Sequence, residues 1–163
     1  MSDAWVINAS PVILLAKAGL IRHIPALANP LVVPQPVATE IILHREEDAA
    51  VQWLRESGKA FVQLPAPELP VLSSYGIGAG ERSVISWAVA NRGFTALLDD
   101  YEARIAAQKL GVRVIGTVGV VLLLKQANLI PEAKSVLLTI RSAGGYISDA
   151  LLREALQRVG EHL

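Results

Sequence analysis

The chain has 163 residues, of which 52% are hydrophobic, so it is long and apolar enough to bury a core and is not a disordered protein. Its formal net charge of zero argues against a broadly basic nucleic-acid-binding surface, and the absence of cysteine excludes disulfides and thiolate metal sites. No basic segment precedes the first apolar residues, and the apolar run at residues 114–124 is too short to span a membrane. We therefore expect a single domain over residues 1–163, with no membrane segment, in a reducing, cytoplasmic setting.

The first half of the chain alternates short apolar strands with helices. Strands are predicted at three places: residues 5–8, 31–33 and 61–64. The helix after the first strand is expected to start at Ser10 as its N-cap, with Pro11 at the first helical position, and to end before Gly19. Further helices are predicted over residues 20–27, from residue 36 onward, and over 48–56.

The second half continues this alternation after a loop rich in proline and glycine at residues 65–78. Strands are predicted over residues 95–98 and 112–115. Helices are predicted at five places: after residues 77–82, over 101–110, 117–127 and 131–142, and from a cap at Ser148. Strands that alternate with helices imply right-handed crossovers and a parallel sheet, so the predicted fold is a three-layer α/β/α architecture with a parallel central sheet.

Residues 77–82 place Glu81 in the opening turn of a long apolar helix. The positions three, four and seven residues later are apolar (Val84, Ile85 and Ala88), so Glu81 shares the stripe that should face the core. An acid in a first turn also complements the helix dipole, which is the simpler interpretation. Its place on the apolar stripe favours a metal-binding or catalytic role instead.

Asp99 and Asp100 follow directly on an apolar strand. Either of them could cap the next helix, and Asp100 is spaced for a surface ion pair with Arg104. In an open parallel sheet, however, strand ends and the following helix starts line one crevice where ligands bind. Three carboxylates directed at that crevice, with Glu81 as the third, indicate a hard divalent cation. Without metal, such acids repel each other and at least one tends to hold its proton.

Two other polar residues are ambiguous by themselves. Glu40 lies at the edge of the apolar face formed by Val37 and Ile41, where a solvated glutamate is the simpler interpretation. Asn8 ends the first strand, and the pattern alone makes it a turn residue.

The ordered set of Asn8, Glu40, Glu81 and Asp100 resembles a PIN domain, in particular the branch akin to the toxin nucleases of bacterial and archaeal toxin–antitoxin pairs. The likeness covers nearly the whole chain and is carried by residues 6–11, 33–34, 37, 40–41, 78–81, 97–100, 103–104, 114–119 and 145–148. The resemblance implies a compact PIN-like α/β/α fold and a metal-dependent ribonuclease that hydrolyses RNA.

The resemblance also implies a role for each matching residue. Glu40 and Glu81 match the second and third acids of the family, and Asp100 matches the fourth, with Asp99 beside it as a reserve ligand for Mg²⁺ or Mn²⁺. Asn8 takes the first-strand position, where the family typically has aspartate. The residues implied to contact substrate around the same crevice are Ser10, Arg104 and Thr117. An antitoxin protein is the implied partner, and the apolar composition leads us to expect a homodimer.

Asn8 leaves more than one function open. A divalent ion held by carboxylates can neutralise developing charge and lower the pKa of an attacking water, so a metal-dependent endoribonuclease is the leading hypothesis. An amide coordinates through oxygen but brings no charge, so the alternative is a catalytically weakened PIN-like binding or regulatory module. A phosphatase or phosphoacceptor domain would need a nucleophilic aspartate where the chain has Asn8.

Overall fold

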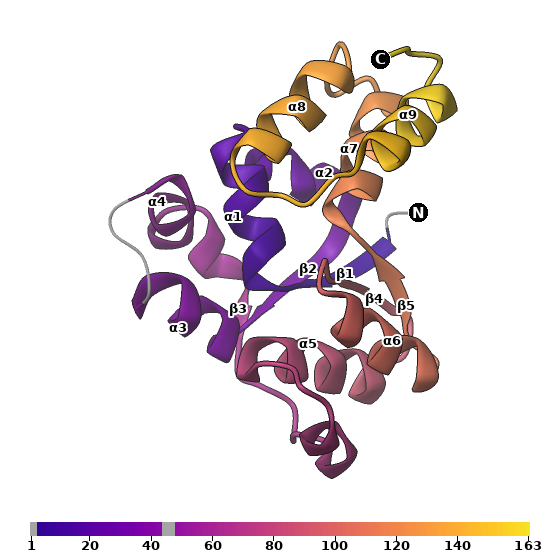
Figure 1. Ribbon diagram of the computed structural model, residues 1–163. Helices are drawn as coiled ribbons and strands as arrows, with labels where there is room; N and C mark the ends of the chain where they lie inside the picture. Colours follow the sequence, from indigo (N-terminus) through magenta and orange to yellow (C-terminus); the bar gives the residue numbers. More distant parts are fainter. Residues whose placement is uncertain (1–2, 44–47) are drawn as a thin grey trace.

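The computed structural model describes residues 3–43 and 48–163 of the protein, and its centre is a parallel β-sheet (Figure 1). Within these residues the sheet has five strands in the order β3-β2-β1-β4-β5, and every neighbouring pair is parallel. The strands are β1 (Asp3–Ile7), β2 (Ala28–Pro34), β3 (Val62–Gln63), β4 (Phe94–Leu97) and β5 (Arg113–Ile115). Each predicted strand is present, so the predicted parallel sheet is confirmed.

Helices cover both faces of this sheet. They are α1 (Ala9–Lys17), α2 (Ile24–Leu27), α3 (Gln35–Leu43), α4 (Ala49–Arg55), α5 (Ala79–Ala90), α6 (Tyr101–Lys109), α7 (Thr117–Gln126), α8 (Lys134–Ser142) and α9 (Asp149–Arg158). Short 3₁₀ helices lie at η1 (Ile21–His23), η2 (Gly58–Phe61) and η3 (Pro70–Ser74). In Figure 1, α5 and α6 lie on one face, and α1 and α7 on the other, with α8 and α9 beyond α7. The three-layer α/β/α prediction is confirmed.

The central strands are apolar on both sides because helices cover both faces. In β1 the side chains of Val6 and Ile7 are fully buried, and in β4 those of Ala96 and Leu97 are too. Continuous apolar runs of this kind are typical of parallel strands in α/β proteins. This packing fixes the ends of the two strands rigidly beside each other.

The order of the strands reverses between β1 and β4, since β2 and β3 lie on one side of β1 and β4 and β5 on the other. Ile7 pairs with Leu97, and Leu97 pairs with Ile115, so the three strands end at one level. The N–H of Asn8 still donates to the carbonyl of Leu97, at 3.1 Å. Ligands of open α/β sheets bind outside the carboxyl ends of the strands at such a reversal.

The start of α1 differs from the prediction, which made Ser10 the N-cap and placed Pro11 at the first helical position. The helix begins at Ala9, and the N-cap residue is Asn8, whose side chain makes no capping hydrogen bond. Pro11 fits within the first turn because the N–H groups of that turn have no intrahelical acceptor in any case. The side chain of Asn8 is therefore not used to cap the helix.

The helix predicted over residues 131–142 begins later, at Lys134. The carboxylate of Glu161 accepts hydrogen bonds from the N–H groups of Ala133, at 2.7 Å, and Lys134, at 2.9 Å. A residue near the C-terminus thus caps α8, which no local pattern predicts. The predicted cap of the last helix is confirmed, because the hydroxyl of Ser148 accepts from the N–H of Leu151 at 3.1 Å.

Among the described residues, no single helix has both the length and the apolar character needed to cross a membrane. The helical segments Ala9–Lys17 and Ile21–Leu27 meet the length and composition criteria only as a pair, and that pair is bent by 111°. Several side chains of these segments, including Leu15 and Ile24, are fully buried in the core.

Candidate active site

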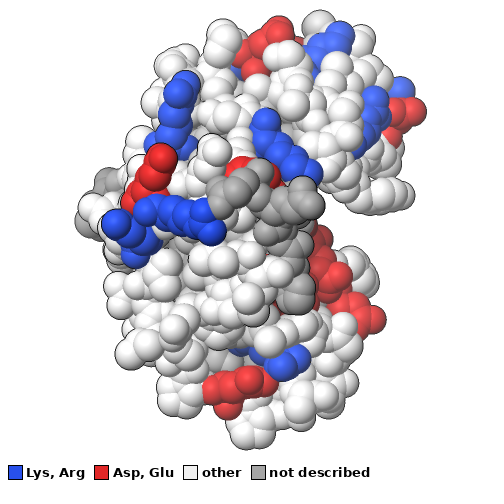
Figure 2. Space-filling model, turned by 90° about the vertical axis from the view of Figure 1, so that its left-hand side faces the viewer, with Lys and Arg blue, Asp and Glu red and all other residues white. Residues whose placement is uncertain are grey.

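All the residues implicated by the sequence line one pocket at the carboxyl ends of the strands. The pocket has a volume of about 1100 Å³. The predicted residues that line it are Asn8, Ser10, Glu40, Glu81, Asp99, Asp100, Arg104 and Thr117. We refer to this pocket as the acidic crevice. In Figure 2 a hollow cuts into the right-hand edge of the molecule, and acidic side chains lie along its lower lip.

Asn8 presents an unpaired oxygen at the crevice. The residue follows β1 directly and is only 5% exposed. Its side-chain Oδ1 is buried and has no hydrogen-bond partner among the described residues. A buried carbonyl oxygen without a partner is unfavourable, so native proteins usually supply a donor, a water or an ion.

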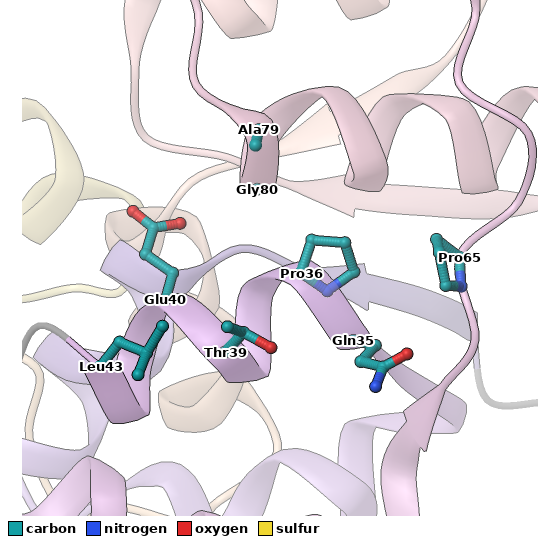
Figure 3. Close-up of a pocket in the computed structure, with 8 residues that line it drawn as sticks. All are labelled: Gln35, Pro36, Thr39, Glu40, Leu43, Pro65, Ala79 and Gly80. Atoms are coloured by element: carbon teal, nitrogen blue, oxygen red, sulfur yellow. The ribbon is translucent and has the colours of Figure 1, made fainter.

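Glu40 approaches the same point from α3. A Cβ atom built on Gly80 would lie 2.5 Å from Oε2 of Glu40 and 3.2 Å from Oδ1 of Asn8. Both oxygens therefore face the start of α5 where Gly80 has no side chain. Figure 3 shows the Glu40 carboxylate extending toward Ala79 and Gly80, at the edge of an adjoining pocket of about 520 Å³ that shares Glu40 with the crevice.

Glu81 is half-buried in the first turn of α5, and its Oε2 accepts from the N–H of Gly78 at 3.0 Å. Burial raises the pKa of the Glu81 carboxyl, and the negative charges of Asp100 and Glu40 raise it further, although the hydrogen bond from Gly78 and the charge of Arg82 oppose this. Glu81 is therefore repelled by both Asp100 and Glu40. A cation placed between them would relieve that repulsion.

Asp99 and Asp100 have different environments. Oδ1 of Asp99 accepts from the N–H of Thr117 at 2.8 Å, and its Oδ2 accepts from the Thr117 hydroxyl at 2.5 Å. Asp100 is exposed and caps α6, with Oδ2 accepting from the N–H of Ala103 at 2.9 Å. Its Oδ1 has no hydrogen bond within the described residues. Asp100 thus keeps a free oxygen at the crevice, whereas Asp99 ties α7 to the loop after β4.

The three residues expected to contact substrate are placed differently. Ser10 is exposed on the first turn of α1. Thr117 is buried, and both its N–H and its hydroxyl donate to Asp99. Arg104 donates from Nη1 to the carbonyl of Leu98 at 3.0 Å. The alternative ion pair between Arg104 and Asp100 is not formed in the part of the chain that the structure describes.

The donor set of the crevice fits a hard cation, although it is not preassembled. Across residues 3–43 and 48–163, no three His, Cys, Asp or Glu side chains lie close enough together to form a metal cluster. Glu40 and Asp100 are exposed, so their side chains can turn toward an ion at little cost. The unpaired oxygen of Asn8 and the repulsion around Glu81 both mark where positive charge would be stabilised.

Sequence reasoning did not identify several other residues of the crevice. Lys17, Tyr101, Tyr146 and Arg158 also line it. Lys17 is exposed and makes no ion pair or hydrogen bond with the described residues. No motif marks these positions, because they come from separate segments that meet only after folding: Lys17 ends α1, Tyr101 begins α6, Tyr146 precedes α9 and Arg158 ends it. Gly80, which faces Glu40 and Asn8, was also missed, although its position directly before Glu81 in the sequence could have pointed to it.

The comparison with protein families agrees with this geometry. Residues 4–161 match the family described as PIN domain. No curated protein and no solved structure matches the chain significantly. The match spans almost the whole chain and accompanies a parallel α/β/α fold of the nuclease type. The chain therefore belongs to the PIN-domain family.

Proposed function

We propose that the protein is a divalent-metal-dependent endoribonuclease that hydrolyses RNA phosphodiesters in the acidic crevice, with Mg²⁺ or Mn²⁺ as its cofactor. The observation that carries the proposal is the meeting of separate chain segments at one crevice. Glu81 lies there with a raised pKa, partly because of Asp100 and Glu40, and the unpaired oxygen of Asn8 faces the same space.

In this proposal Glu40, Glu81 and Asp100 hold the cation through carboxylate oxygens, and Asn8 adds a neutral amide oxygen. The bound ion supplies charge neutralisation at the phosphate and lowers the pKa of the attacking water. Asp99 acts as a positioning residue, because its contacts with Thr117 hold the start of α7 against the end of β4. Arg104 is fixed by the carbonyl of Leu98, which keeps its positive charge at the edge of the crevice for a substrate phosphate.

The test is cleavage of a labelled RNA oligonucleotide with Mn²⁺, with Mg²⁺ and with a chelator. We expect metal-dependent cutting that Glu81→Gln lowers by on the order of a thousandfold, because several kcal/mol of charge stabilisation are lost. Glu132→Gln is the matched control, since Glu132 is an exposed acid outside the crevice. Absence of metal-dependent cutting, or equal cutting by Glu81→Gln, contradicts the proposal.

Asn8 supports one other function, that of a weakened PIN-like binding or regulatory module. The amide gives the crevice one negative charge fewer than an aspartate would. Asn8→Asp separates the two functions: cutting that appears only in this variant favours the weakened module, whereas cutting by the natural chain favours the enzyme. Two accompanying proposals rest on the sequence: the resemblance to toxin nucleases supports an antitoxin protein as partner, and the apolar composition supports a homodimer in solution.

A further inference from the structure

Exposed aromatic side chains occur at one place in the described chain. The sequence contains three tryptophans, three tyrosines and two phenylalanines. Within the described residues, all of these are buried or half-buried except Tyr101 and Tyr146, which are 75% and 93% exposed. Both exposed tyrosines line the acidic crevice. Two large exposed rings at the same pocket offer apolar surface to a ligand.

The two tyrosines come from different parts of the fold. Tyr101 is the first residue of α6 and directly follows Asp100. Tyr146 lies in the segment between α8 and α9, which Figure 1 shows on the other side of the sheet from α6. An extended ligand that crosses the crevice from one tyrosine to the other would therefore pass Asp100.

Neither ring has a structural task that explains its exposure. Neither side chain makes a hydrogen bond or a ring contact within the described residues. The third tyrosine, Tyr75, is half-buried with Lys109 over its ring at 6.0 Å. The rings of Tyr101 and Tyr146 are thus largely exposed, unlike those of the other aromatic residues that the structure describes.

Positive charge lies along the same crevice. Lys17 has no partner within the described residues, and Arg104 and Arg158 also reach the pocket. Arg158 forms an exposed ion pair with Glu154, at 2.8 Å, and such a pair opens at little cost. Cations beside exposed aromatic rings are the combination that binds single-stranded nucleic acid, with phosphates on the cations and bases on the rings.

We propose that Tyr101 and Tyr146 each stack one unpaired base of the RNA, on either side of the phosphodiester that lies at the cation held by the acids. This inference rests on the proposed function, since it takes RNA as the substrate. Bases in a duplex are already stacked on one another and cannot be splayed onto a side chain without unpairing. The two tyrosines would therefore make the crevice select unpaired RNA over duplex RNA.

The test compares Tyr101→Ala and Tyr146→Ala with the corresponding phenylalanine variants. Stacking on an aromatic residue contributes about 1–3 kcal/mol per base, so we expect each alanine variant to raise KM for a single-stranded oligonucleotide about tenfold and to change kcat little. The double alanine variant should raise KM about a hundredfold, since the sites are separate. Both phenylalanine variants should stay within about twofold of the natural protein, because the ring is kept.

A direct readout of stacking is the fluorescence of 2-aminopurine placed in the oligonucleotide, recorded with Ca²⁺ in place of the catalytic metal. We expect the natural protein to quench it and the alanine variants to lose the quenching. Val71→Ala is the control, since Val71 is also an exposed apolar side chain, at 52%, but does not line the crevice. A duplex of the same sequence should bind the natural protein and the alanine variants equally.

The outcomes separate the stacking inference from the ribonuclease proposal. Metal-dependent cutting with an unchanged KM in both alanine variants overturns the stacking inference and leaves the nuclease standing. Tyrosine-dependent quenching without any cutting overturns the nuclease and supports the stacking. Phenylalanine variants as impaired as the alanine variants overturn base stacking as well, and so do tyrosines that prove to be covered by a second protein chain in solution.

Discussion

Two glutamates at two helix starts illustrate how differently the same local feature can be used. Glu81 accepts one N–H at the start of α5, and Glu161 accepts two at the start of α8. At both carboxyls burial alone would raise the pKa, and the net direction depends on what surrounds each of them. At Glu161 the hydrogen bonds from Ala133 and Lys134, with the charges of Lys125 and Lys134, outweigh burial and lower the pKa overall. At Glu81 the neighbouring acids add to the effect of burial and the pKa is raised.

The comparison distinguishes a carboxylate whose ionised form the fold favours from one whose ionised form the fold disfavours. Glu161 is surrounded by hydrogen-bond donors and positive charge, so the fold stabilises its ionised form. Glu81 is half-buried and faces other carboxylates, so folding raises its pKa and makes its ionised form less favourable than in the unfolded chain. Perturbed acids in a cleft are typical of functional sites, whereas satisfied ones are typical of structural contacts.

The largest expected effect comes from substituting Asp99 and Asp100 in turn, which distinguishes a structural acid from a crevice acid as the two glutamates do. Asp100→Asn keeps a good N-cap for α6 but loses a charge at the crevice, so we expect metal-dependent cutting to fall on the order of a thousandfold with little change in stability. Asp99→Ala loses both bonds to Thr117 and should lower the free energy of unfolding by about 2 kcal/mol. Cleavage rates and urea unfolding of both variants check this. Equal loss of stability in the two variants would remove the distinction.

Gly80→Ala should disturb the acidic crevice and leave the structural contacts of Glu161 unchanged. The new Cβ would lie 2.5 Å from Oε2 of Glu40, which must move away, so we expect about a hundredfold loss of cutting. Stability should change little, because the clash is with the end of a flexible side chain and alanine favours the helix. Gly78→Ala is the matched control, since a Cβ there meets nothing within 4 Å. Comparable losses in both variants contradict the proposed position of Glu40.

Glu161→Ala removes the carboxylate that caps the start of α8. Losing the two hydrogen bonds at the start of α8 should lower the free energy of unfolding by about 1–2 kcal/mol. Glu154→Ala in α9 is the control, because its exposed pair with Arg158 contributes less than about 1 kcal/mol. Thermal unfolding measures both, and a Glu161 variant as stable as the Glu154 variant would refute the capping role.

The smallest effect is the pH dependence of stability, and it has opposite signs at the two sites. The pKa of Glu161 is lowered by folding, so its contribution is present above the unfolded pKa and is lost as pH falls through the folded pKa. The pKa of Glu81 is raised, so its contribution is present below the unfolded pKa and is lost as pH rises through the folded pKa. Glu81→Gln should therefore make the metal-free protein more stable at neutral pH. A less stable variant there would contradict the repulsion described above.

Most of the fold follows from local patterns. Short apolar strands and amphipathic helices alternate in the sequence, and Gly19 ends α1 with a φ of 74°, a left-handed conformation that favours glycine. The predicted start of α1 was wrong. Ser10 and Asn8 are both good N-cap residues two positions apart, and side-chain preference alone does not choose between them.

The arrangement of the crevice follows from the sequence only in part. The ends of parallel strands and the helix starts that follow line one crevice, so Asp99 and Asp100 were expected there with Glu81, whereas only the family resemblance placed Asn8 beside them. The choice between Asp99 and Asp100 depends on Thr117, eighteen residues away along the chain, and the cap of α8 depends on Glu161. Contacts of this kind exist only after folding. The exposure of Tyr101 and Tyr146 could not be predicted for the same reason.

The most direct test of the central claim is a crystal of the protein soaked in Mn²⁺ and measured at a wavelength where manganese scatters anomalously. The account predicts one or two anomalous peaks in the acidic crevice, within coordination distance of Oδ1 of Asn8 and of the carboxylates of Glu81 and Asp100. A crevice without an anomalous peak at saturating Mn²⁺, or an ion held only by acids elsewhere on the surface, would contradict it.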